Sequence, residues 1–224
     1  MADEAVYEAR REAAPALAVA VSLLVLLAAV SGAKGWQLLY LPSWIWLVPA
    51  LATLVLMVDL YLGVRGPSLA LSRRAAVVLL FVLVVGNLVG LGFLVAGLVT
   101  TSTEDLGGGE LLLTAAVIWI TNVIAFGLLY WEIADAGPVI RSGKPRAKPD
   151  FQFPQDENLQ LARDGWHPTV WDYLYVSLTN SIAFSPTDAM PLTRHAKVLM
   201  ASESVISVVA VLLVAARAVN VLGS

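Results

Sequence analysis

One short segment between two apolar stretches combines groups suited to holding cations. It reads AFSPTD, with two hydroxyls, a proline that interrupts a helix, and a carboxylate. One such carboxylate per copy forms an acidic ring, which concentrates cations at the mouth of a pore. We therefore predict a permeation site formed by Ala183, Phe184, Ser185, Pro186, Thr187 and Asp188. Alternatively, Ser-Pro-Thr-Asp is ordinary turn chemistry, and Asp188 caps the next turn or pairs with Arg194.

A second carboxylate, Glu203, lies inside the apolar stretch that follows. An ionisable side chain in a membrane-spanning helix is costly, so it usually faces the protein interior or a water-filled path. Glu203 shares one helix face with four residues spaced three or four apart. If this helix lines a pore, the lining stripe is Glu203, Ser207, Ala210, Val214 and Arg217. Alternatively, Glu203 pairs with Arg194, Lys197 or a neighbouring hydroxyl.

The element that must position the turn is a short apolar helix before it. A membrane-spanning helix needs about 20 apolar residues, and residues 171–184 supply fewer. We expect a half-helix that enters the membrane and stops at a non-helical turn, which is tolerated there only beside protein or a water-filled cavity. Polar side chains on this helix and the preceding span are expected to support the turn: Thr179, Asn180 and Asn122.

The half-helix, the turn with its Asp, and the run Pro-Leu-Thr before a basic residue resemble the pore module of the two-transmembrane potassium-channel family. The resemblance covers the last quarter of the chain and aligns Asp188, Pro191, Thr193 and Lys197. It implies a homotetramer around a central path. The C-terminus is also similar to that of a family of bacterial inner-membrane proteins of about this size.

The turn departs from the potassium-channel filter at its centre. Ser185 and Thr187 stand where the family has glycines, and Pro186 replaces the aromatic residue between them. A carbonyl-lined filter needs backbone angles that glycine adopts without steric cost, and proline fixes one of those angles. The resemblance therefore implies the scaffold of a pore and not potassium selectivity.

Composition places the chain among multi-pass membrane proteins, because 58% of its 224 residues are hydrophobic and 14% are charged. We predict an all-α integral membrane fold with five spans plus the re-entrant half-helix and turn before the last span. The third span carries Gly86 and Gly90 four residues apart, a spacing that lets helices approach closely. The five apolar segments are 15–33, 44–64, 75–99, 110–131 and 196–222.

Basic residues predict the orientation. Twelve of the fourteen lie in the N-terminal leader, in the connection between the second and third spans, or between the fourth and fifth spans, which leaves Lys34 and Arg217. The positive-inside rule therefore predicts a cytoplasmic N-terminus and a C-terminus outside the inner (plasma) membrane. This orientation inverts the half-helix and turn relative to potassium channels, where the loop enters from the outer face.

The chain divides by composition into four parts. They are a charged leader (1–14), a four-helix transmembrane region (15–131), a polar cytoplasmic connection (132–170) and the pore-like module (171–224). The connection is rich in proline and glycine, with one short helix expected at 156–163 and Asp156 as its cap. Its basic cluster is expected to lie near anionic lipid headgroups and comprises Arg141, Lys144, Arg146 and Lys148.

The sequence gives little support to enzymatic chemistry. It has no cysteine, only two histidines, and none of the common hydrolase, metalloprotease or phosphate-loop motifs. No metal, cofactor or nucleic-acid partner is expected. The favoured function is passive flux of small ions, with cations preferred, through a homo-oligomer in the bilayer. The alternatives are a secondary transporter of a small solute and a non-conducting structural protein on a channel-like scaffold.

Overall fold

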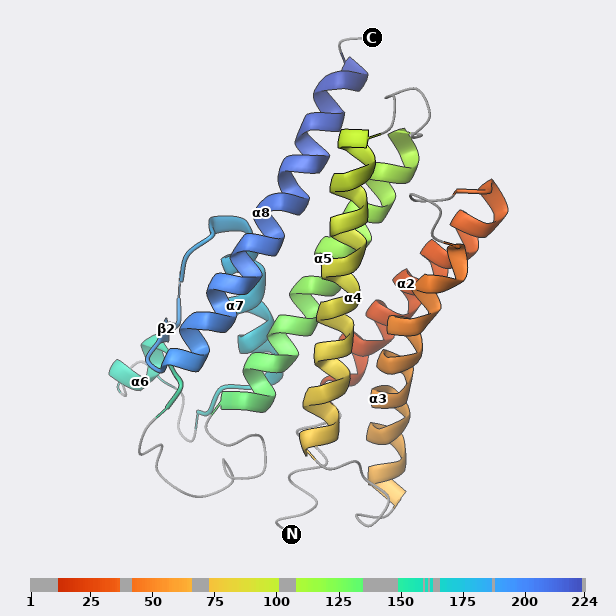
Figure 1. Ribbon diagram of the computed structural model, residues 1–224. Helices are drawn as coiled ribbons and strands as arrows, with labels where there is room; N and C mark the ends of the chain where they lie inside the picture. The colour runs from red at the N-terminus through yellow and green to blue at the C-terminus, as the bar shows by residue number, and fades with distance from the viewer. Residues whose placement is uncertain are drawn as a thin grey trace.

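The structure, a computed structural model, describes residues 12–36, 42–65, 73–100, 108–134, 149–158, 160, 162, 166–186 and 188–222. These residues are almost all helical. Five long helices lie side by side and alternate in direction (Figure 1): α2 (Ala14–Lys34), α3 (Leu47–Arg65), α4 (Arg73–Thr100), α5 (Gly108–Ile133) and α8 (Arg194–Leu222).

Four of these helices, α2, α4, α5 and α8, are long and apolar enough to cross a membrane. The apolar part of α3 is shorter and spans Ser43–Asp59, including the 3₁₀ turn η1 (Ser43–Trp46) that precedes the helix. The described residues therefore confirm an all-helical, membrane-type fold with four such helices.

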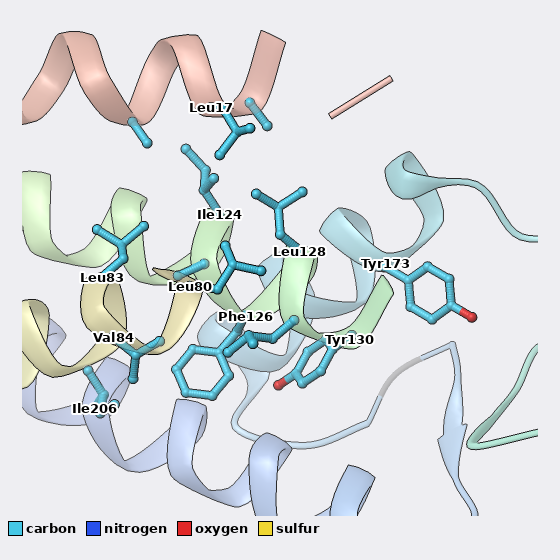
Figure 2. Close-up of a cluster of buried hydrophobic side chains, with 14 of the residues drawn as sticks. Leu17, Leu80, Leu83, Val84, Ile124, Phe126, Leu128, Tyr130, Tyr173 and Ile206 are labelled. Carbon is cyan, nitrogen blue, oxygen red and sulfur yellow. The ribbon is translucent and has the colours of Figure 1, made fainter. Parts of the chain in front are cut away.

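Helix α5 occupies the centre of the molecule. About 72% of its apolar span is buried inside the protein, against 28% for α8, because α2, α4, α7 and α8 all pack against it. Figure 2 shows side chains from these helices meeting in one core. The labelled residues are Leu17, Leu80, Leu83, Val84, Ile124, Phe126, Leu128, Tyr130, Tyr173 and Ile206.

The glycines of α4 allow the close helix approach that their spacing predicted. A Cβ atom on Gly90 would lie 2.7 Å from the indole ring of Trp46, and one on Gly86 would lie 3.3 Å from Pro49. A larger residue at Gly90 would therefore force the Trp46 ring or η1 to shift.

Helix α7 (Val170–Ala183) runs only part of the way along α5 and α8. It starts beside the beginning of α8 and ends near the middle of that helix, after which the chain turns back (Figure 1). The returning chain forms β2 (Met190–Pro191), which pairs antiparallel with β1 (Phe151–Gln152). The segments before and after α7 are thus tied together at one end of the molecule.

Local hydrogen bonds and aromatic packing fix the start of α7. The Asp172 carboxylate accepts hydrogen bonds from the backbone N–H and the hydroxyl of Thr169, at 2.7 and 2.8 Å. These bonds satisfy groups that a helix N-terminus otherwise leaves unpaired. The Tyr173 ring packs edge-on against Phe151 and Phe153, with centroids 5.8 and 5.4 Å apart.

The structure corrects the prediction of a short helix at 156–163. Helix α6 spans Pro154–Glu157, two residues earlier, because proline fits the first helical turn. Asp156 is therefore inside the helix, and its carboxylate accepts the backbone N–H of Phe153 at 2.8 Å. It satisfies the helix start from the third position instead of acting as the cap residue itself.

Candidate functional site

A buried carboxyl group joins α8 to both α5 and α7. Glu203 is fully buried. Its Oε2 atom accepts hydrogen bonds from the Tyr130 hydroxyl at 2.5 Å and from the Asn180 amide at 2.7 Å. Its Oε1 atom contacts the Ser177 hydroxyl. We call Glu203, Tyr130, Ser177 and Asn180 the carboxyl cluster.

The carboxyl cluster holds α7 along one face. Ser177 and Asn180 are three residues apart, so both point from α7 toward α8. The Asn180 amide also donates to the backbone carbonyl of Met200 at 3.0 Å and accepts the Ser204 hydroxyl at 3.2 Å. These contacts fix the height of α7 against α8.

Ser177 also joins the carboxyl cluster to the backbone of α5. Its hydroxyl lies within hydrogen-bond distance of Glu203 Oε1 and of the Val123 carbonyl, 2.7 Å away. The polar side chains of the cluster thus all have hydrogen-bond partners, as a buried site requires.

Glu203 has no positive partner within the part of the chain that the structure describes. Its hydrogen-bond partners are two hydroxyls and an amide. Arg194 and Lys197 are exposed at the start of α8, and Arg194 is about 13 Å away along the helix axis at 1.5 Å per residue. The interpretation that Glu203 binds a neighbouring hydroxyl is therefore confirmed, and pairing with Arg194 or Lys197 is wrong.

The structure also corrects the prediction that one face of α8 lines a pore. Glu203, Ser207 and Ala210 are fully buried within the single chain, where side chains of α5 and α7 contact Glu203 and Asn122 of α5 contacts Ser207. Val214 is partly buried against the core, and the side chain of Arg217 lies outside the described residues. The first three positions therefore form an internal packing face. Helical spacing places them on one face of α8, but it does not show whether that face packs inside the chain or lines a pore.

The supporting residues have different roles. The side chain of Asn180 joins α7 to α8 and does not contact a described residue of the turn. Thr179 donates to the Tyr175 carbonyl of its own helix at 2.9 Å, and this bond does not link α7 to the turn or to another helix. Asn122 of α5 donates to Ser207 at 3.5 Å, while its Oδ1 atom is buried without a hydrogen-bond partner among the described residues. Asn122 thus forms a second, less satisfied polar layer one turn of α8 beyond Glu203.

The turn after α7 is exposed. Phe184 adopts a left-handed conformation with φ 54° and is 43% exposed. Ala183, Ser185, Pro186 and Asp188 are also exposed, and Thr187 lies outside the described residues. The basic cluster from Arg141 to Lys148 lies outside them as well.

The turn lies opposite the middle of α8. Helix α8 extends from Arg194 to Leu222, and Ser204 lies about 15 Å along it at 1.5 Å per residue, which is half of a hydrocarbon core about 30 Å thick. Ser204 bonds to Asn180, one helical turn before Phe184. The exposed, non-helical residues after α7 thus lie about half a membrane thickness from the start of α8, a helix that is long enough to cross a membrane (Figure 1).

The fold defines the class of an all-helical membrane-type protein with a polar site between three helices. The chain matches no protein-family model, no curated protein and no solved structure.

Proposed function

We propose that the protein is a homo-oligomer that permits passive flux of small cations along a path lined by residues 183–188. The observation that carries this proposal is the exposed turn opposite the middle of α8. Lipid cannot hydrogen-bond the free N–H and C=O groups of such a turn. In a bilayer the turn therefore needs water or a second copy of the chain beside it.

Two features of the turn favour cations. It follows the C-terminus of α7, where the last carbonyl groups of a helix carry a partial negative charge. Asp188 adds a full carboxylate on the exposed side. In an assembly, each copy would contribute one such pair to a shared path.

We also propose how the helices cross the membrane. We count α3 as the fifth span and α7 with its turn as a re-entrant segment, and the resemblance to potassium-channel pores suggests a tetramer. The basic residues Arg74, Arg194 and Lys197 flank the starts of α4 and α8, whereas Lys34 ends α2. The positive-inside rule then assigns the end that carries β1 and β2 to the cytoplasm.

Flux through liposomes tests the role of Asp188. Asp188→Asn should lower cation flux about two- to tenfold at low salt, and the difference should shrink near 1 M salt, where screening acts over about 3 Å. Glu157→Gln is the matched control, because Glu157 is exposed on α6, away from the turn. Equal flux in wild type and Asp188→Asn at low salt would remove Asp188 from the path.

A second candidate function is a transporter in which Glu203 itself binds a proton or cation inside each chain. The carboxyl group is buried without a positive partner, and such groups mark proton and ion pathways in membranes. The unpaired Asn122 Oδ1 atom lies in the next polar layer. Glu203→Gln distinguishes the candidates, since it should abolish flux in a transporter and preserve it in the oligomeric path. A well-folded oligomer without any flux would instead favour the structural role.

A further inference from the structure

A groove on the outside of the helix bundle has an apolar floor and a basic end. It lies between α4 and α8 over α5, and its volume is about 770 Å³. Phe81, Val85 and Leu88 of α4 line one wall, and Val198 lines the other. This volume falls within the range of about 300–1,000 Å³ that is typical of sites for small ligands.

The basic end of the groove is formed by Arg194 and His195 in the first turn of α8. Both side chains are exposed. Arg194 carries a planar guanidinium that can bind two oxygens of one phosphate, and His195 adds a second N–H donor beside it. The charge at this end is therefore complementary to an anionic headgroup.

The length of the groove matches one leaflet of a bilayer. Its lining on α8 extends from Arg194 to Ile206, which is about 18 Å at 1.5 Å per residue. Half of a hydrocarbon core about 30 Å thick is about 15 Å. With Arg194 at the headgroup level, the apolar part of the groove would reach the middle of the bilayer.

We propose that this groove binds one anionic phospholipid, with an acyl chain along α4 and α8 and the phosphate at Arg194 and His195. The groove uses a different face of α8 from Met200, Glu203 and Ser204, which contact α7. The site is therefore independent of the proposed path at the turn. The charged end favours a lipid over a second copy of the chain as the occupant.

Native mass spectrometry of the delipidated protein can measure this binding. Phosphatidylglycerol and phosphatidylcholine with identical acyl chains are titrated separately. Wild type should bind one phosphatidylglycerol at least about fivefold more tightly than phosphatidylcholine, since each basic residue near a membrane surface contributes about 1 kcal/mol toward anionic lipid. Equal affinity for the two lipids would overturn the proposal.

Two variants test whether lipid binding depends on Arg194 and His195 or on any positive charge at this end of α8. The double variant Arg194→Gln, His195→Gln should lose the preference for phosphatidylglycerol. Lys197→Gln is the matched control, because Lys197 is exposed on the same helix but does not line the groove. It should keep the preference; an equal loss in this control would mean that any positive charge at this end suffices, and the site would be rejected.

A groove-filling variant tests the acyl-chain contact. Ser202 lines the groove and is exposed, so Ser202→Trp can occupy the space without disturbing the core. It should weaken binding of both lipids while the Tm measured without lipid stays unchanged. Unaltered phosphatidylglycerol affinity, or a change in oligomeric mass instead of lipid binding, would contradict the proposal; the second result would identify another copy as the occupant.

Discussion

Replacing Glu203 by alanine should loosen α7 from the rest of the protein. The change removes the acceptor for Tyr130 and Asn180 and the contact with Ser177. Asn180 keeps its bond to the Met200 carbonyl, and Ser177 keeps its bond to Val123. The Tyr130 hydroxyl loses its acceptor and remains buried, so it carries the largest share of the cost.

The size of the effect follows from these contacts. A stranded buried hydroxyl costs about 1–3 kcal/mol, and each further lost hydrogen bond costs about 0.5–1.5 kcal/mol. With two further lost bonds, from Asn180 and Ser177, the sum is about 2–6 kcal/mol and is centred on about 4 kcal/mol. For 150–250 residues, soluble-protein scaling converts each 1 kcal/mol into about 2–4 °C, so Tm should fall by about 8–16 °C.

Glu203→Gln is the matched control. A glutamine keeps one oxygen to accept from Tyr130 and Asn180, and its amide can donate to the Ser177 oxygen. Its Tm should stay within about 3 °C of wild type in the same detergent, equivalent to less than about 1 kcal/mol. If Glu203→Gln destabilised the protein as much as Glu203→Ala, a neutral group would not suffice. If Glu203→Ala left Tm unchanged, the carboxyl cluster would not hold α7.

The remaining predictions concern packing and orientation. Gly127→Val should lower Tm through an overpacking cost of about 1–3 kcal/mol, because a Cβ there would lie 2.9 Å from the Leu174 backbone. Gly92→Val is its control, since nothing lies within 4 Å of a Cβ at that position, and an equal loss in both would refute the contact. In this cysteine-free chain, a cysteine at exposed Ala33 should react with an impermeant maleimide on intact cells, and one at exposed Glu157 only after permeabilisation. The opposite pattern would reverse the proposed orientation.

The sequence predicted the long helices well, because an apolar stretch of membrane length leaves the backbone little choice but a helix. The segment 110–131 became α5 (Gly108–Ile133), and 15–33 became α2 (Ala14–Lys34). A short helix that ends at Phe184 was also predicted, since Pro186 and the polar residues after it interrupt the apolar run; its entry into the membrane stays a prediction. The pairing of β1 with β2 was missed, because two-residue strands carry no periodic pattern.

The carboxyl cluster was only partly predictable. Helical spacing identified the face of α8 that carries Glu203, but not its neighbours, and Tyr130 lies 73 residues away in sequence. One signal was present: Val123, Gly127 and Tyr130 follow each other four and three residues apart, so they share one face of α5. A glycine on that face lets α7 approach, and the tyrosine hydroxyl then reaches the shared carboxyl group.

The cluster and the exposed turn are connected through the rigidity of α7. Asp172 and the aromatic rings fix the start of the helix, and Asn180 fixes its end one turn before Phe184. The end of α7 is therefore held at a defined height against α8. Under the proposed function, Glu203→Ala should reduce cation flux although Glu203 does not touch the path, because the turn would lose its support. Glu203→Gln should retain the flux, whereas Asp188→Asn should reduce flux without lowering Tm. If Glu203→Ala lowered Tm but left flux unchanged, the position of the turn would not govern permeation.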